Sequence, residues 1–353
     1  MDTSDPNILF DEDGICDHCN QFKSITLPLW NNCQKKESLE KIISKIKNSS
    51  KRSNYNCILG LSGGVDSSYM LHLAVKEFGL KPLVFHVDGG WNSNISTTNI
   101  EKLVNKLGLD LFTEVINWEE MRKFQLAYLR SGVPHIDIPQ DLAFIATLYK
   151  YANKNNIKWI LNGGNFSTEC VRNPLTYFYY GSDMKHNNYI RKNFGANKMP
   201  TYPFSSVLWH KVWLRYVKRV KVIKLLNYVD YDKETAVIKL QKEYGWKPYA
   251  QKHFESRFTK FFEGYWLLKR FGFDSRRVQF SSLILTNQMT REEALEKISK
   301  SPFTKEQELQ EYTFIADKLE IEIEELDKIF KLPLKYYYDY PNSFKLFDFG
   351  ARI

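Results

Sequence analysis

The residues with the clearest capacity for chemistry form a short segment rich in glycine and serine, Ser62-Gly63-Gly64-Val65-Asp66-Ser67-Ser68. Adjacent glycines adopt turn conformations that other residues resist, and they let the backbone approach an anion closely. Successive backbone N–H groups then make a concave anion site, to which a following helix adds the positive end of its dipole. We expect the hydroxyls of Ser62, Ser67 and Ser68 to donate to phosphate oxygens. Asp66 cannot favour phosphate directly, so we expect it to bind Mg²⁺ beside a polyphosphate.

The pattern on either side of this segment predicts an α/β fold with a doubly wound parallel sheet. Between about residues 55 and 165, short apolar runs alternate with longer amphipathic segments. This alternation indicates a parallel sheet that is covered by helices on both faces. The expected strands are 57–61, 83–87, 111–115 and 159–161, and the expected helices are 67–78, 96–107, 119–130 and 140–154.

Three glycine-containing segments follow the predicted strands. They are the segment 62–68, Asp88-Gly89-Gly90 and Asn162-Gly163-Gly164. In parallel sheets, ligands bind at the carboxyl ends of the strands. Because all three segments fall at that edge, the sequence predicts that they share one nucleotide site.

The whole chain divides into three predicted regions. Residues 1–50 form a small N-terminal unit with a helix near 38–46, and residues 51–205 form the nucleotide-binding domain. Residues 206–353 form a mainly helical region for binding substrate or a partner, with helical patterns at 254–271 and 290–299. The second of these opens with Thr290 and Glu293 at the spacing of a capping box.

The composition is that of a globular protein with an anionic partner. The formal net charge is +9, and 43% of the residues are hydrophobic. No apolar stretch is long enough to span a membrane, and the acidic N-terminus does not resemble a secretory signal, so we expect a cytoplasmic protein. The five cysteines are an odd number and do not suggest a disulfide framework. A homo-oligomer is compatible with this composition.

Aromatic and basic residues gather between residues 208 and 221. This mixture is compatible with RNA contact, although we expect nucleic acid not to be the partner. A surface helix whose Lys and Arg side chains reach into solvent explains the same pattern. A third interpretation is that the positive charge attracts a small phosphorylated substrate.

The segment 62–68 lacks the Gly-Lys-Ser/Thr ending of a Walker A motif. It resembles the pyrophosphate-binding loop of the ATP pyrophosphatase (PP-loop) superfamily, Ser-Gly-Gly-x-Asp-Ser. The resemblance implies that ATP is split into AMP and pyrophosphate, and that AMP is transferred to a carbonyl-type oxygen to make it a leaving group. It also places adenine near Leu61, Val87 and Asp88, and the triphosphate near Asn162, Gly163 and Gly164.

Two further regions, together with the loop, resemble the N-acetyl sugar amidotransferases of bacterial surface-polysaccharide and nonulosonic acid biosynthesis. They are the N-terminal residues 1–19 and a downstream block that includes 253–265, 269–274, 281–284 and 289–294. This resemblance implies that ATP activates an acetamido group of a nucleotide-linked sugar and that ammonia converts it to an acetamidino group. It also implies a separate glutaminase with a cyclase-like companion as the ammonia source.

The downstream block places charged residues at helical spacing. We expect Arg257 and Lys260, together with His253, to bind the anionic substrate, because an Arg side chain suits bidentate contact with phosphate or carboxylate. A solvated charged helix face is the alternative interpretation.

Upstream, Asp137 and Asp141 lie four residues apart, and we assign Asp141 a catalytic role in binding Mg²⁺ or the incoming ammonium. Helix capping is the alternative for Asp141.

Cys16 and Cys19 have the spacing of a structural zinc site, which normally needs four ligands. In the resembling family a second Cys-x-x-Cys pair lies just upstream of the segment that matches Met1-Asp2-Thr3. Zinc in the present sequence would therefore need replacement ligands such as Cys33 or His18. Two free thiols in a turn are the alternative.

Two other function classes stay open at this point. One is tRNA modification, either thiolation or lysidine formation, through the same adenylylation; the 208–221 segment favours it, and the lack of a catalytic cysteine pair weakens it. The other is a nucleotide-sensing or scaffold protein that binds ATP without turnover.

Overall fold

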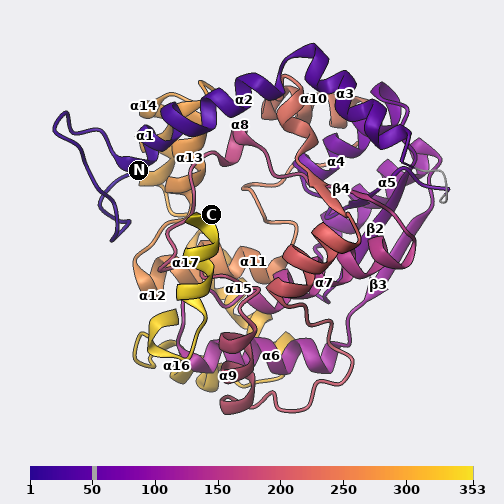
Figure 1. Ribbon diagram of the computed structural model, residues 1–353. Coiled ribbons are helices and arrows are strands. Elements are labelled where there is room, and N and C mark those ends of the chain that lie inside the picture. The colour runs from indigo at the N-terminus through magenta and orange to yellow at the C-terminus, as the bar shows by residue number, and fades with distance from the viewer. Residues whose placement is uncertain (50–53, 353) are drawn as a thin grey trace.

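The computed structural model describes residues 1–49 and 54–352, and it contains a five-stranded sheet, on the right in Figure 1. The strand order is β3-β2-β1-β4-β5, and every neighbouring pair is parallel. The strands are β1 (Cys57–Gly60), β2 (Pro82–Asp88), β3 (Leu111–Val115), β4 (Trp159–Leu161) and β5 (Lys221–Ile223). The chain builds outward from β1 in one direction through β2 and β3, then in the other through β4 and β5. The order therefore reverses between β1 and β4, which is where such sheets bind ligands.

Both faces of the sheet are covered, as predicted. Side chains of a strand alternate between the faces, so Leu59 and Ile58 of β1 belong to different apolar clusters. The Leu59 cluster contains residues of α4, α5 and α10, whereas the Ile58 cluster contains Ala152 of α7. These helices are α4 (Val65–His72), α5 (Asn94–Leu107), α10 (Lys233–Tyr244) and α7 (Ile138–Lys154). The α/β doubly wound fold is confirmed.

The four predicted strands and the helices between them are present with small differences at their ends. The helix after the nucleotide loop begins at Val65 and continues after His72 as a π-helical turn, Leu73–Glu77. The third connection is α6 (Trp118–Ser131). The sequence pattern did not indicate β5, because its three residues end a basic segment and two of them are exposed. The sheet thus extends beyond residue 205, into the region that we expected to be mainly helical.

The N- and C-terminal regions add helices to this α/β core. The N-terminal helices are α1 (Asp17–Gln21), α2 (Leu27–Cys33) and α3 (Lys36–Lys47), and they run along the top of the molecule in Figure 1. Short helices α8 (Phe166–Glu169) and α9 (Met184–Asn193) follow β4. The C-terminal region contains α11 (Arg257–Phe261), α12 (Leu267–Phe271), α13 (Arg276–Leu285), α14 (Arg291–Ser299), α15 (Lys305–Leu319), α16 (Ile323–Phe330) and α17 (Phe344–Arg352).

The predicted helix at 254–271 is confirmed as α11, a π-helical turn at Phe262–Trp266 and α12 in succession. Phe258, Phe261 and Trp266 are fully buried, which explains why this segment is so aromatic. The predicted capping box opens α14, where the Thr290 side chain accepts from Glu293 N and the Glu293 side chain accepts from Thr290 N.

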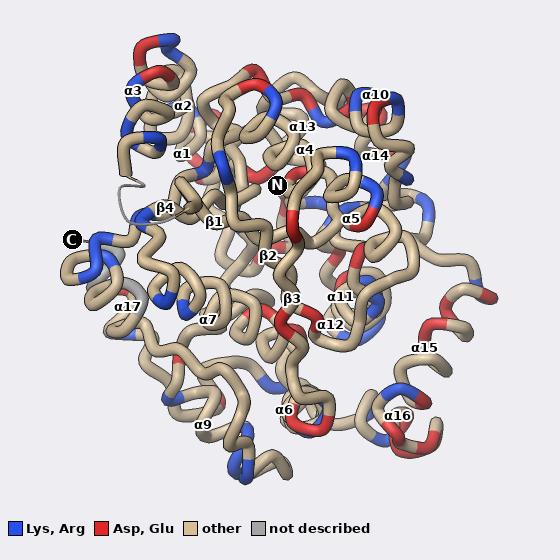
Figure 2. The backbone as a smooth tube through the Cα atoms, turned by 90° about the vertical axis from the view of Figure 1, so that its right-hand side faces the viewer, with Lys and Arg blue, Asp and Glu red and all other residues tan. Residues whose placement is uncertain are grey.

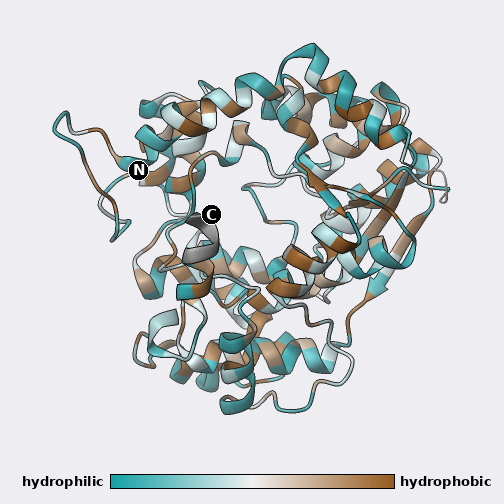
Figure 3. Cartoon of the chain, in the orientation of Figure 1, coloured by the Kyte–Doolittle hydropathy of each residue, from teal (hydrophilic) through white to brown (hydrophobic). Residues whose placement is uncertain are grey.

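Charge and hydropathy follow this arrangement. Lys, Arg, Asp and Glu are frequent along outer helices such as α3, α10 and α16 (Figure 2), whereas hydrophobic residues lie along the strands and α7 (Figure 3). Every helix among residues 1–49 and 54–352 is too short or too polar to cross a lipid bilayer.

Candidate active site

The glycine-rich loop connects β1 directly to α4. Gly63 has a φ of +83°, and a Cβ atom there would lie 2.8 Å from the backbone oxygen of Ser96. A Cβ atom on Gly64 would lie 2.6 Å from a carboxylate oxygen of Glu255. Gly63 therefore requires glycine for its conformation, whereas a Cβ atom on Gly64 would displace the end of the Glu255 side chain, which comes from far along the chain.

Two serine hydroxyls shape the inside of this loop. The Oγ atoms of Ser62 and Ser67 lie 3.2 Å apart, and the Ser62 hydroxyl accepts a hydrogen bond from Gly64 N at 3.2 Å. Ser96 Oγ donates to the Ser62 carbonyl at 2.9 Å and ties the loop to α5. The structure differs from our expectation at Ser68, whose side chain is fully buried beneath the loop and does not face an incoming phosphate.

A cavity of about 310 Å³ opens between the β1 loop and the β4 loop, at the point where the strand order reverses. It brings together many of the predicted nucleotide residues, namely Ser62, Gly64, Asp66, Ser67, Asn162, Gly163 and Gly164. A Cβ atom on Gly163 would lie 3.3 Å from Ser67 N, so the β4 loop packs directly against the start of α4. Two of the three segments that we expected to share a nucleotide site, 62–68 and 162–164, therefore meet at this cavity.

The residues expected near adenine do not line this cavity. Leu61 is a buried core residue, and Val87 also packs against the core. The Asp88 carboxylate accepts hydrogen bonds from Gly90 N at 2.8 Å and Asn92 Nδ2 at 3.0 Å, so it fixes the turn after β2. Gly63 does not line the cavity itself, but its carbonyl accepts hydrogen bonds from two residues of the cavity wall, Trp246 at 3.2 Å and Tyr249 at 3.0 Å.

Asp66 lies at the centre of a charged cluster. One carboxylate oxygen accepts a hydrogen bond from the Tyr231 hydroxyl, and the other lies 3.3 Å from Lys252 Nζ. Lys252 also contacts Glu169 at 2.7 Å and donates to Thr168 Oγ1 at 3.2 Å. Burial opposes the charge of Lys252, but Asp66 and Glu169 outweigh it and raise the pKa of this lysine. Lys252 is therefore a fixed positive charge beside the nucleotide loop.

A second acidic group approaches the loop from the C-terminal region. Glu255 lies 3.4 Å from Ser62 Oγ, and its backbone oxygen accepts from Ser93 N at 2.9 Å. Burial raises the pKa of the Glu255 carboxyl. A carboxylate with a raised pKa is a stronger base than an ordinary glutamate, which suits it to accept a proton at a reaction site.

His253, one of the predicted substrate residues, lines the same cavity. Its Nδ1 atom lies 2.8 Å from Glu263. Burial disfavours the charged imidazole, but Glu263 outweighs that effect and raises the pKa of His253 to about 9. The backbone there has a φ of +65°, which a residue with a side chain rarely adopts.

Arg257 and Lys260 do not face either the loop or the cavity. The Arg257 guanidinium lies 3.1 Å from one oxygen of Glu311, and Lys260 Nζ lies 2.8 Å from the other. Glu311 is a buried residue of α15, and the guanidinium also stacks over the Phe314 ring, 3.3 Å from its centroid. The structure therefore places these two cations against a buried carboxylate and not at the cavity, so it does not support the expectation that they bind substrate.

Asp141 also lies outside the cavity, on the exposed side of α7, 3.6 Å from His135 Nε2. The side chain of Asp137, the residue before this helix, accepts from Thr259 Oγ1 and Gln140 Nε2, each at 2.6 Å. Burial and the nearby Asp141 raise the pKa of Asp137 to about 7. Asp137 thus links α7 to α11, and the two carboxylates do not form a cation site with the loop.

The Sγ atoms of Cys16 and Cys19 lie 3.4 Å apart. His18, a suggested replacement ligand, instead bonds to Asp5 at 2.9 Å. Over residues 1–49 and 54–352, no three His, Cys, Asp or Glu side chains gather in a metal-binding arrangement. The structure therefore does not support the zinc expectation.

Sequence reasoning missed an important part of the site, the segment from Tyr231 to Lys252. It contributes Lys233, Trp246, Tyr249 and Lys252 to the cavity wall. No motif marks these residues, because their role depends on where the chain folds back over the β1 loop. The one available signal is the Gly-Trp-Lys-Pro-Tyr run at 245–249, which is typical of an ordered loop.

Comparison with known proteins agrees with this arrangement. Residues 56–137, which contain β1, the loop, β2 and β3, match the phosphoadenosine phosphosulfate reductase domain. Residues 255–353 match the C-terminal domain of LPS biosynthesis protein WbpG-like proteins. These two matches support a PP-loop ATP pyrophosphatase domain joined to a C-terminal domain similar to that of WbpG-like proteins.

One curated relative is sulfate adenylyltransferase subunit 2 of Stutzerimonas stutzeri (strain A1501), 34% identical over 99 residues. The match covers 27% of the present chain and 32% of the relative, so the chain spans about a third of that protein's length.

Similar solved structures include the NMN synthetase of Francisella tularensis, with 16% identity, a TM-score of 0.38 and coverage of 85% of this chain and 97% of that one. They also include the NH3-dependent NAD synthetase of Campylobacter jejuni subsp. jejuni, with 15% identity, a TM-score of 0.30 and coverage of 63% and 99%. The U34-tRNA thiolase NcsA of Methanococcus maripaludis has 14% identity, a TM-score of 0.33 and coverage of 85% and 82%.

Proposed function

We propose that this enzyme converts an acetamido group of a nucleotide-linked sugar to an acetamidino group, in the synthesis of bacterial surface polysaccharide. The observation that carries the proposal is the approach of Glu255 to the nucleotide loop, 3.4 Å from Ser62. Glu255 is the first residue of the WbpG-like domain. The domain characteristic of polysaccharide biosynthesis therefore supplies a proton-exchanging group at the point where ATP is cleaved.

The reaction has two steps that balance. The amide oxygen attacks the α-phosphorus of ATP, pyrophosphate leaves, and an O-adenylyl imidate forms. Ammonia then adds to the imidate carbon, AMP leaves with the former amide oxygen, and the amidine remains in its protonated form. ATP is required because an amide oxygen is otherwise a very poor leaving group.

Four side chains of the cavity and the backbone of the loop have a part in these steps. The backbone amides of the loop and the hydroxyls of Ser62 and Ser67 hold the phosphates. Lys252 stabilises the charge that develops on the departing pyrophosphate. Glu255, as a carboxylate, takes a proton from the nitrogen of the attacking ammonia.

The oxygen ligands of the loop suit Mg²⁺ that arrives with ATP, since this ion keeps several waters and needs only one or two protein carboxylates. Asp66 is the residue that would hold it. When bound, the ion would neutralise charge on the phosphate oxygens.

The ammonia source is also part of the proposal. A glutaminase with a cyclase-like companion would deliver ammonia to the open side of the cavity. Equal activity of the purified chain with glutamine alone and with ammonium would contradict this part.

The direct test incubates the purified chain with ATP, Mg²⁺, ammonium chloride and a panel of nucleotide-linked N-acetyl sugars. We expect AMP and pyrophosphate to form only with the right sugar, and mass spectrometry to show an NH group in place of one sugar oxygen. ATP cleavage that leaves every sugar unchanged would refute the proposal.

One observation favours tRNA modification as a second candidate. Trp213 and Tyr216 are 46% and 67% exposed on the π-helix Leu208–Val217, beside the basic residues Lys218 and Arg219. Aromatic and basic side chains of this kind stack on and attract single-stranded nucleic acid. Salt-sensitive binding of tRNA, lost in Trp213→Ala, would favour this candidate over the sugar.

A further inference from the structure

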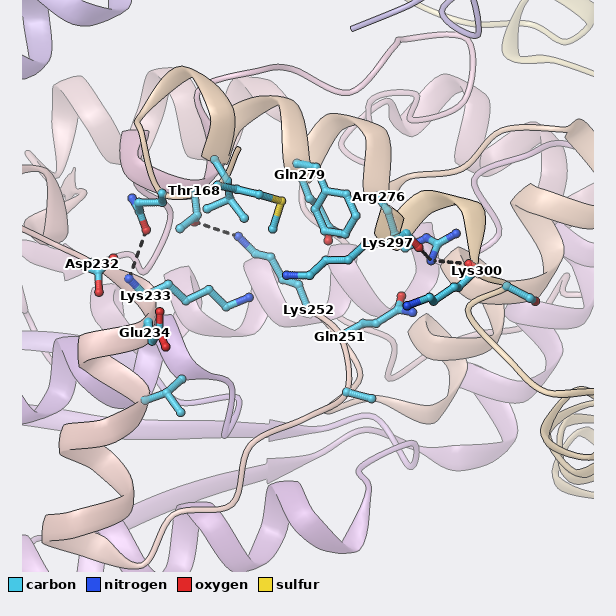
Figure 4. Close-up of a pocket in the computed structure, with 17 residues that line it drawn as sticks. Thr168, Asp232, Lys233, Glu234, Gln251, Lys252, Arg276, Gln279, Lys297 and Lys300 are labelled. Atoms are coloured by element: carbon cyan, nitrogen blue, oxygen red, sulfur yellow. Dashed lines mark hydrogen bonds between the residues drawn. The ribbon is translucent and has the colours of Figure 1, made fainter. Parts of the chain in front are cut away.

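A second and larger cavity adjoins the nucleotide cavity. Its volume is about 570 Å³, within the range of sites that bind small molecules. Its walls come from α8, α10, α13, α14 and the segment before Lys252 (Figure 4). The two cavities share Lys233, Val237, Ala250, Gln251 and Lys252, so a ligand in the larger one reaches the nucleotide loop across this boundary.

Positive charge dominates the lining of the larger cavity. The cationic residues are Lys233, Lys252, Arg276, Lys297 and Lys300, against two acidic residues, Asp232 and Glu234. Asp232 caps α10 by accepting from Thr235 N at 2.7 Å, and Glu234 is exposed. The cavity also has apolar walls at Phe280, Leu283 and Met289.

Three of these cations already have partners. Arg276 makes a two-pronged contact with Asp274 and donates to the carbonyls of Lys297 and Lys300, which holds α13 to the end of α14. Lys300 lies 2.7 Å from Glu296. Lys252 contacts Asp66 and Glu169.

The other two, Lys233 and Lys297, differ from the rest. Neither ammonium makes an ion pair or a hydrogen bond with any residue that the structure describes. Both side chains extend into the cavity from opposite walls (Figure 4). Burial lowers the pKa of Lys233, and the charges of Lys252 and Lys297 add to this effect, whereas those of Asp66 and Glu255 oppose it. Two like charges that face one shared space without a counterion are stabilised when an anion enters it.

We propose that Lys233 and Lys297 bind the diphosphate of the nucleotide-linked sugar in the larger cavity, with the sugar directed across the boundary toward the nucleotide loop. This inference rests on the proposed function and names the site of its second substrate. The apolar wall at Phe280 and Leu283 accommodates the nucleoside. Lys297 lines only the larger cavity, whereas Lys233 lines both cavities. A change at Lys297 should therefore affect the binding of the second substrate and leave the binding of ATP unchanged.

Calorimetric titration with UDP-N-acetylglucosamine, UDP and CDP, and separately with ATP and Mg²⁺, tests this site in the full chain. We expect Lys297→Gln to raise the Kd for the diphosphate ligand that binds best by about tenfold, since it removes one charge-assisted contact. The same variant should leave the Kd for ATP within about twofold and lower the salt dependence of sugar-nucleotide binding. Lys233→Gln should weaken the binding of both the diphosphate ligand and ATP.

Lys300→Gln is the matched control, because Lys300 lines the same cavity but already pairs with Glu296. Equal affinities of Lys297→Gln and Lys300→Gln for the diphosphate ligands would overturn the inference, and so would a wild-type chain that binds none of the three. Weakened binding by Lys297→Gln without any amidine product in the wild type would leave the site standing and refute the proposed function. Amidine formation by Lys297→Gln at an unchanged KM for the sugar nucleotide would support the proposed function and refute the proposed binding site.

Discussion

Two pairs of cations in the C-terminal half of the chain show how a counterion decides the role of a charged residue. Arg257 and Lys260 lie one helical turn apart and share the buried Glu311 of α15. Lys233 and Lys297 lie on different helices and share a cavity, with no counterion among the residues that the structure describes. The first pair holds two helices together, and the second is available to a ligand. Sequence spacing identified the first pair and gave no sign of the second.

Lys252 combines the properties of both pairs, since it has two carboxylate partners but lies at the nucleotide loop. We expect Lys252→Met to lower kcat/KM for pyrophosphate release by about a thousandfold, because a fixed charge aimed at the leaving group is lost. Lys252→Arg should recover part of the rate. If the Met variant released pyrophosphate at the wild-type rate, Lys252 would have a structural role, like Arg257 and Lys260.

Glu255 is the acidic counterpart of this comparison, a carboxylate at the cavity whose pKa burial raises. Glu255→Gln should slow ammonia-dependent turnover by about a hundredfold while ATP–pyrophosphate exchange continues. The reacting form is the carboxylate, so the wild-type rate should rise as pH passes upward through the raised pKa. Measured at a constant concentration of free ammonia, this rise should be absent from the variant. A variant that keeps the same pH profile would exclude Glu255 as the base.

The substitution Glu311→Gln tests the first pair, Arg257 and Lys260, directly. It leaves Arg257 and Lys260 without their counterion, and because both are partly exposed we expect a loss of about 2 kcal/mol in the free energy of unfolding. Urea unfolding measures this, and the KM for sugar in the matching Arg257→Met variant should stay unchanged.

The control for that experiment is Glu308→Gln on the same helix, which removes a single pair with Lys269. Its effect should stay below about 1 kcal/mol. An Arg257→Met variant with normal stability and a raised KM for sugar would restore the original assignment of this residue to substrate binding.

The smallest expected effect concerns His253, a cation at the edge of the cavity whose partner, Glu263, is buried. Its pKa rises from 6.5 to about 9 beside Glu263, so its contribution to stability is complete below pH 6.5 and is lost as pH rises through about 9. We expect this contribution to be below about 1 kcal/mol, since the side chain is 40% exposed. Urea unfolding of His253→Gln at several pH values should show no such decline, and a decline equal to that of the wild type would assign it to another group.

Much of the fold was predictable from local patterns. The strands near Ile58, Val84 and Ile160 follow from short apolar runs between helical segments, because a strand covered on both faces must be apolar throughout. The strand β5 was not predictable, because its residues are partly exposed and its place depends on pairing with β4. Among the candidate site residues, Ser62, Gly64 and Asp66 lie where the loop motif indicated, whereas Asp141 does not line the cavity.

Local sequence specifies the nucleotide loop and the sheet edge on which it lies, because glycine conformation, strand ends and helix starts act over a few neighbouring residues. Which charges remain without a counterion depends on the three-dimensional fold. Glu311 neutralises Arg257 from more than 50 positions away, and Lys233 meets Lys297 across a cavity between distant helices. Electrostatic energy depends on distance and burial in space, and neither can be read from the order of residues along the chain.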